Sequence, residues 1–266
     1  MENEIWHLNT DFNTLPARDG LQNILRDDRK NYDKAELELG EDIKLLDDAL
    51  VLYIEALQAG YHQVDKWKDN DSNRAAVAML ISALNYILLA RHGILLGYYP
   101  EARDLLRSCF ERTLSCFLFF HDEKYARRFL SGKKIWQGEI RKELSSLEED
   151  TDKSKELHKR LNEYYNILSE VVHPNLKSFE ARYGEKDLGE RVGLVYVFGG
   201  LMGSNFGHVV IIRIVQTVLS ALRILGIIFH DETGSWDKEY QEISKKCNEI
   251  VDNLPAGDIK GNNEIE

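Results

Sequence analysis

Residues 73–120 read NRAAVAMLISALNYILLARHGILLGYYPEARDLLRSCFERTLSCFLFF, and this stretch decides the fold class. Its first half is apolar on nearly all sides of a helix, which is typical of a helix in the middle of a bundle. Gly97 ends that helix, and Pro100 and Glu101 open the next one, because proline suits a first helical turn and an acid suits the positive end of the dipole. Two helices joined by so short a turn pack as antiparallel neighbours. We therefore predict an all-α protein.

The rest of the chain repeats this pattern. Apolar residues recur at intervals of three and four from Ala35 to Lys68, which predicts an amphipathic helix that follows a short one over 19–30. The chain has only 4 prolines, so long helices can run without interruption. We predict an antiparallel helical bundle with a peripheral charged hairpin, over these ranges: main helices 35–68, 73–96, 100–121 and 205–229, hairpin helices 134–149 and 153–172, and shorter helices 123–130 and 236–251.

Composition places the chain among soluble globular proteins. It has 266 residues, 43% of them hydrophobic and 30% charged, with a net charge of −11. Such an acidic balance argues against a dominant nucleic-acid surface, since those surfaces rest on clustered lysine and arginine. No composition shift indicates a linker, so we predict a single domain over 1–266. Its core would span about 35–252, and residues 1–18 and 255–266 would be irregular. Residues 184–207, which hold seven glycines, would form a long loop, with or without a short extended piece.

The segment 205–229 is apolar enough to be mistaken for a membrane span. Arg213 and Arg223 interrupt it, and a central arginine in lipid is costly, so we predict a core helix and no membrane contact. Its apolar residues lie on most sides, and a shared interface would cover the remainder, so we expect a homodimer. The odd number of cysteines, 3, and the absence of a signal-peptide core at the N-terminus predict a cytoplasmic protein.

Two polar insertions in apolar helices supply a candidate site. Arg107 and Glu111 lie four residues apart on one helix face, on a flank that carries leucines one and two turns later. His173 precedes a proline and therefore closes its helix, with Ser169 one turn back and Tyr165 two turns back. We expect these five side chains to meet across the bundle, with Arg107 and Glu111 largely buried and paired. The opposite, wetter face of their helix would carry Asp104, Ser108, Arg112 and Ser115.

Two interpretations of this cluster remain open. In the functional one, Glu111 orients His173 as an acid–base group while Arg107 holds a phosphate or carboxylate. In the structural one, the cluster is a polar network that sets helix register. No metal site is expected, because repeated Glu-x-x-His pairs do not occur, and no cofactor is expected either. His92 and His208 flank apolar helices and are predicted to be structural histidines.

Three motifs carry a resemblance to a family of mostly prokaryotic helical proteins that is known only as a domain of unknown function: Gly97-Tyr98-Tyr99-Pro100-Glu101-Ala102, Leu105-Leu106-Arg107-Ser108 with Glu111, and Ser169-Glu170-x-Val172-His173-Pro174. The resemblance covers residues 75–230 and implies an all-helical fold. More distantly, the chain resembles HEPN helical domains, many of which are ribonucleases in toxin and anti-phage defence systems. Their signature places an arginine four to six residues before a histidine, whereas the candidate arginine here, Arg107, belongs to another helix.

Two functions follow as expectations. The first is a cytoplasmic helical binding or interaction protein, in which the cluster is mainly structural and the partner is a protein. The second, implied by the HEPN resemblance, is a metal-independent ribonuclease with His173 as base and Arg107 on the phosphate of an RNA. Tyr165, Ser169 and Tyr99 are the candidate binding residues in either case. Whether the protein is an enzyme stays open at this point.

Overall fold

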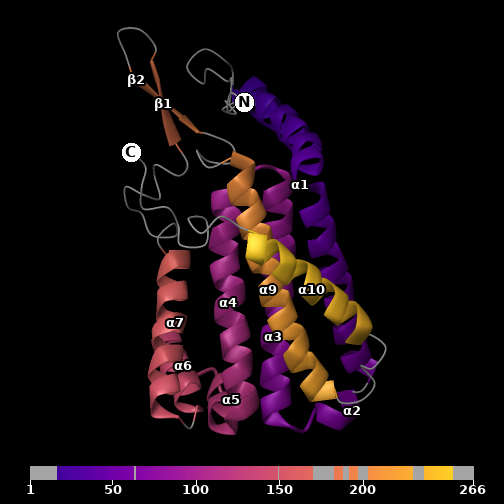
Figure 1. Cartoon of the computed structure of the whole chain (residues 1–266), viewed down its shortest axis with the longest axis vertical. Coiled ribbons are helices and arrows are strands. Elements are labelled where there is room, and N and C mark those ends of the chain that lie inside the picture. The colour runs from indigo at the N-terminus through magenta and orange to yellow at the C-terminus, as the bar shows by residue number, and fades with distance from the viewer. Residues whose placement is uncertain are drawn as a thin grey trace.

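The computed structural model describes residues 17–62, 64–148, 150–169, 183–187, 192–196, 203–229 and 237–253. It confirms the all-α class, with one small strand pair attached (Figure 1). The elements in chain order are α1 (Ala17–His62), α2 (Val64–Trp67), α3 (Asp71–Leu95), α4 (Tyr99–His121), α5 (Glu123–Leu130), α6 (Gln137–Ser146), α7 (Thr151–Ser169), β1 (Tyr183–Asp187), β2 (Val192–Tyr196), α9 (Gly203–Phe229) and α10 (Asp237–Asn253).

The beginning of the bundle differs from the prediction. The expected helices over 19–30 and 35–68 are one continuous helix, α1, which ends at His62 and is followed by the single turn of α2. Residues 31–34 contain neither glycine nor proline, so nothing breaks the backbone between the two predicted segments. Asn31 and Ala35 are both buried there, so tertiary packing holds the junction in helical form.

Neighbouring residues form the turns at both ends of α3. The Asn70 side chain caps α3 by accepting a hydrogen bond from the backbone N–H of Asn73 at 3.0 Å. After α3 ends, Gly97 adopts a φ of 78°, which glycine tolerates without strain. Pro100 then occupies the first turn of α4. The short turn folds α4 back against α3 as an antiparallel neighbour (Figure 1).

The direction of α9 departs from a simple antiparallel bundle. The beginning of α9 packs on the first half of α1, where Gly207 lies against Leu39, and its end packs on the end of α1, where Gly60 lies against Phe229. These contacts make α9 parallel to α1, as Figure 1 also shows. The physical reason is the return path through α7, which carries the chain back to the end of the bundle where α1 begins, so that α9 starts there too.

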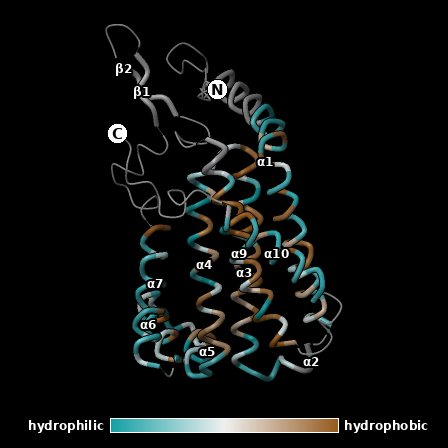
Figure 2. Tube along the Cα trace, viewed as in Figure 1, coloured by the Kyte–Doolittle hydropathy of each residue, from teal (hydrophilic) through white to brown (hydrophobic). Residues whose placement is uncertain are grey.

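The centre of the core is α9. It packs on α1, α4, α3 and α10, and Ile211, Val215 and Leu225 have no exposed surface. Figure 2 shows that the most hydrophobic stretches of the trace lie on α9 and α3. By length and composition alone, residues 71–95 and 207–229 could each span a membrane. Most apolar side chains of residues 207–229 are covered within the chain, and Ile227 is the large one left exposed.

Among the peripheral elements, α5 has its predicted bounds and α6 is shorter than the predicted helix over 134–149. The charged hairpin consists of α6 and α7, which pack on each other and on α4. The predicted loop over 184–207 contains an antiparallel strand pair, in which Tyr183 pairs with Tyr196 and Asp187 with Val192, and α9 already begins at Gly203. The predicted termini, 1–18 and 255–266, lie largely outside the described residues, and so does the end of the predicted helix 153–172.

Candidate functional site

The predicted pair of Arg107 and Glu111 is confirmed as a contact. Because the two residues lie one turn apart on α4, the guanidinium Nε of Arg107 donates to Oε1 of Glu111 at 3.0 Å. Nη2 of the same arginine donates to the hydroxyl of Tyr165 on α7 at 2.5 Å. We expected the pair to be largely buried, and the side chains of Arg107 and Glu111 are 17% and 20% exposed.

A second arginine joins this contact from α6. The guanidinium carbon of Arg141 lies 3.8 Å from the ring centroid of Tyr165, and that of Arg107 lies 4.7 Å from it. Nε of Arg141 also donates to Oδ1 of Asn162 at 2.7 Å, and the residue is only 9% exposed. Tyr165 therefore contacts two cations through its π face and its hydroxyl. Sequence analysis missed Arg141, because on a short, strongly charged helix nothing marks one arginine as the buried one.

The other residues predicted for this site have different surroundings. The hydroxyl of Ser169 donates to the backbone carbonyl of Tyr165 at 2.6 Å, so it is bound within its own helix. His173 lies outside the described residues. Tyr99 is buried against Gly207 and Leu39, at the start of α9, and burial raises the pKa of its hydroxyl. The structure thus brings Arg107, Glu111 and Tyr165 together and places Tyr99 in a different contact.

The predicted wetter face of α4 is only partly covered. Ser115 is buried and donates to the carbonyl of Glu111, and Arg112 lies 3.8 Å from the ring centroid of Tyr86 on α3. Nε of Arg112 also donates to the hydroxyl of Ser82, at 2.8 Å. Ser115 is buried while Ser108 and Arg112 stay partly exposed, because α4 packs on α3, α7 and α9 at once.

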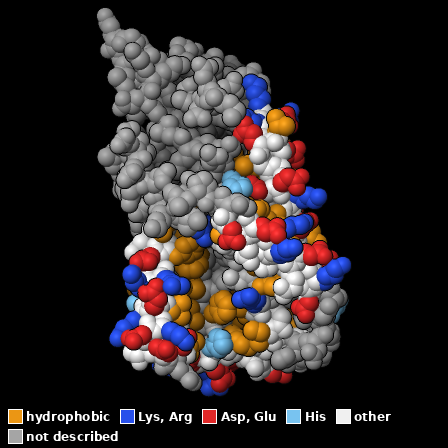
Figure 3. Space-filling view, viewed as in Figure 1, with side chains coloured by type: hydrophobic (Ala, Val, Ile, Leu, Met, Phe, Trp, Pro, Cys, Tyr) orange, Lys and Arg blue, Asp and Glu red, His pale blue; other side chains and the backbone are white. Residues whose placement is uncertain are grey.

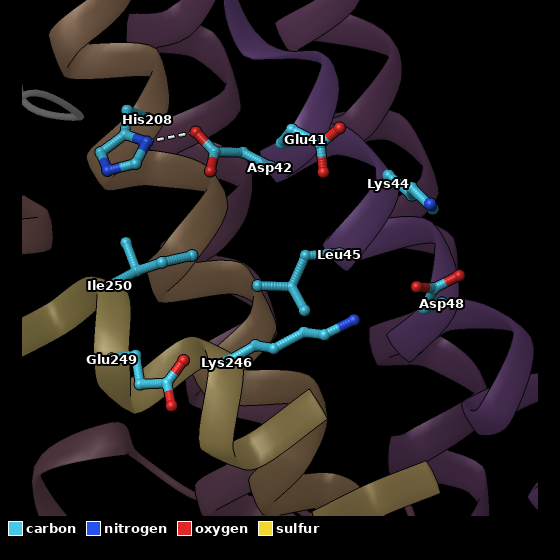
Figure 4. A pocket seen from close by; sticks show the side chains of 9 residues that line it. All are labelled: Glu41, Asp42, Lys44, Leu45, Asp48, His208, Lys246, Glu249 and Ile250. Atoms are coloured by element: carbon cyan, nitrogen blue, oxygen red, sulfur yellow. Dashed lines mark hydrogen bonds and ion pairs between the residues drawn. The ribbon is translucent and has the colours of Figure 1, made fainter. Parts of the chain in front are cut away.

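A pocket of about 510 Å³ lies elsewhere, between α1, α9 and α10 (Figure 4). That volume falls in the range of small-molecule sites. Its wall combines side chains from both ends of the sequence, which the bundle brings side by side. The lining residues are Glu41, Asp42, Lys44, Leu45 and Asp48 from α1, His208 from α9, and Lys246, Glu249 and Ile250 from α10.

A histidine–carboxylate pair closes one end of this pocket. Nδ1 of His208 is hydrogen-bonded to the carboxylate of Asp42, across 166 positions of sequence. The two side chains are 30% and 12% exposed, so the pair is more enclosed than the rest of the polar lining. Sequence analysis treated His208 as a structural histidine and overlooked Asp42. A signal existed, because Asp42 lies three residues after Leu39 and four before Leu46, at a position on the apolar stripe of its helix.

The pocket is richer in acids than in bases. Four carboxylates and two lysines line it, which gives a net charge of about −2 with a neutral histidine. Figure 3 shows charged side chains of both signs over α1 and α10. No hydroxyl or thiol is among the nine lining residues, and the polar groups there are carboxylates, two amines and one imidazole. Among the described residues, no group of three or more histidine, cysteine or acidic side chains is arranged to hold a metal ion.

Comparison of the chain with protein-family models, with curated proteins and with solved structures finds no match in any of the three. The assignment of a function therefore rests on the geometry of the two polar sites described above.

Proposed function

We propose that this protein is a helical binding protein, and that the pocket between α1, α9 and α10 is its ligand site. The observation that carries the proposal is the pocket itself, which has the volume of a small-molecule site and converging charged groups. The enclosed pair of Asp42 and His208 gives it one ordered polar wall. Three buried free cysteines support a reducing compartment, which agrees with a cytoplasmic protein.

The cluster on α4, α6 and α7 supports a structural role in this proposal. Nε and Nη2 of Arg107 are taken up by Glu111 and Tyr165, and Arg141 is held by Asn162 and by the ring of Tyr165. Guanidinium groups held in this way orient three helices relative to one another. A phosphate could reach these donors of Arg107 only by displacing Glu111 or Tyr165, which disfavours the alternative of a HEPN-like ribonuclease in toxin or anti-phage defence.

The charge of the pocket indicates the ligand class. Asp48, Glu41 and Glu249 line it together with Asp42, and they outnumber Lys44 and Lys246. A small organic cation with more than one ammonium group would pair with these carboxylates, while a multivalent anion would be repelled. The two lysines would restrict the positions at which such a cation could lie, because like charges in contact are unfavourable.

Spermidine is a suitable probe of this proposal in thermal melts. A ligand that binds only the folded state at a hundred times its Kd stabilises that state by about 2.7 kcal/mol. We expect spermidine to raise the melting temperature, and the double variant Asp48→Asn, Glu249→Gln to lose most of that rise. Asp152→Asn is the matched control, because Asp152 is a 94% exposed acid outside the pocket. An equal rise in all three proteins would show general charge screening and refute the site.

The ribonuclease alternative has its own test. Purified protein is incubated with a labelled single-stranded RNA, in parallel with His173→Ala and Arg107→Ala. A general base contributes about 10²–10⁴-fold in rate, so cleavage that depends on His173 would be plain. We expect intact RNA in all three reactions. Cleavage by the unchanged protein that vanishes in His173→Ala would replace the binding proposal by the ribonuclease one.

A further inference from the structure

One face of α3 is exposed and almost free of charge. The exposed residues of this helix all fall within one 120° arc, at positions 74, 78, 81, 85, 88, 89 and 92. Ile81, Leu88 and Leu89 on this arc are 50%, 42% and 56% exposed. Between Arg74 and Arg91 the helix carries no charged side chain. We call the part of this arc from Ala78 to His92 the α3 stripe; it is about 21 Å long at 1.5 Å per residue.

Such a stripe is unusual on a chain with a net charge of −11. Soluble monomers rarely leave a continuous apolar patch uncovered, and a patch of this kind marks an interaction surface. The opposite face of α3 belongs to the core, where Ala76, Leu80, Ala83 and Ile87 are buried. The helix therefore cannot leave the bundle to enter a membrane without exposing that core. Acidic molecules are also repelled by anionic lipid surfaces.

Five positions of the stripe, 78, 81, 85, 89 and 92, are spaced symmetrically about Asn85, and Leu88 lies beside this pattern. In an antiparallel pairing of two copies of α3 with the two-fold axis at this residue, Ile81 of one copy lies opposite Leu89 of the other. Ala78 lies opposite His92, and Asn85 lies opposite itself. A single amide among apolar contacts can hydrogen-bond across such an axis, and it fixes register in paired helices. Because the stripe is uncharged, the two acidic chains can approach there with the least repulsion.

We propose that the α3 stripe is a homodimer interface, formed by two antiparallel copies of α3 with Asn85 on the two-fold axis. The proposal does not depend on the ligand pocket, which lies between α1, α9 and α10. It also differs from a dimer through α9, because α9 is covered by neighbouring helices of its own chain. The occupant of the stripe is thus a second copy of this protein.

Sedimentation equilibrium of the full chain tests the interface. We expect the unchanged protein to be a dimer at micromolar concentration. Leu89→Glu should raise the dimer Kd by about a hundredfold or more, since it places two charges in an apolar contact. Ile227→Glu is the matched control, because Ile227 is a similarly exposed apolar residue, at 47%, on α9. Circular dichroism checks that both variants stay folded. A monomeric unchanged protein, or equal effects of the two variants, would overturn the proposal.

A cross-linking experiment tests the two-fold axis directly. Asn85→Cys would bring the new thiol next to its own copy, so oxidation with diamide should give a covalent dimer quickly. Leu37→Cys, at an 86% exposed position on α1, measures random collision and should cross-link slowly. The native cysteines are buried and do not contribute. Equal rates for the two variants would overturn the proposal. So would binding of the unchanged protein to anionic vesicles that Leu89→Glu abolishes, because the stripe would then be a membrane surface.

Discussion

Replacement of Gly60 by alanine tests how closely the end of α1 packs on the end of α9. A Cβ atom at Gly60 would lie 2.0, 2.2 and 2.7 Å from the ring atoms Cζ, Cε2 and Cε1 of Phe229. The ring would have to move by about 1.4 Å before the shortest contact reached 3.4 Å. Phe229 is only 4% exposed and also packs on Trp67, whose indole donates to the carbonyl of Gly60 at 2.8 Å. The ring therefore has little room to move away.

The expected change in the free energy of unfolding of Gly60→Ala is the sum of two opposing effects. Overpacking of this kind costs about 1–3 kcal/mol. The change from glycine to alanine within a helix returns about 0.5–1 kcal/mol through backbone entropy. We expect Gly60→Ala to lower the free energy of unfolding by about 0.5–2 kcal/mol. Gly40→Ala, in the same helix, has nothing within 4 Å of its Cβ and should raise that free energy by about 0.5–1 kcal/mol.

Urea unfolding followed by circular dichroism measures both variants. The decisive observation is the sign of the change in the free energy of unfolding. Gly60→Ala and Gly40→Ala are chemically identical and differ only in what the new methyl group contacts. Phe229→Leu adds a second check. It should cost less in the Gly60→Ala background than in the unchanged protein, since it removes the clashing ring atoms. Shifts of equal sign and size for the two glycine variants would refute the packing of α1 on α9.

Three further predictions use the same urea assay. Arg107→Ala should lower the free energy of unfolding by about 1–3 kcal/mol, because it leaves Glu111 without its partner. Glu111→Gln should cost less, because the amide oxygen still accepts a hydrogen bond. No change in either variant would contradict the contact. Asn70→Ala should cost about 1 kcal/mol through loss of the α3 cap, and an unchanged unfolding midpoint would show that this cap is dispensable. Burial raises the pKa of Cys109 from 9.0 to about 12, so the thiol ionises in the unfolded chain before it does so in the folded one. Its contribution to stability is complete below pH 9 and is lost as the pH rises towards 12, and Cys109→Ala should weaken that decline.

Local sequence determined where α3 and α4 begin and end, because these boundaries depend on neighbouring residues alone. Asn70 caps α3 through a hydrogen bond three residues away, and Gly97 turns the chain because it accepts a positive φ. The contact of Arg107 with Glu111 is local in the same sense, since one helical turn separates them. The all-α class follows from the same periodicity, which is a property of each helix by itself.

Tertiary structure alone decided which faces are covered and which distant groups meet. Asp42 and His208 lie 166 positions apart, and they touch only because α9 runs parallel to α1. Burial of Arg141 against Tyr165 likewise depends on how α6 and α7 pack on α4. An amphipathic pattern indicates that a helix has an apolar side, but it does not specify the neighbour that covers that side. Long-range packing determines which helices become neighbours, and the pocket and the uncovered α3 stripe both result from that arrangement.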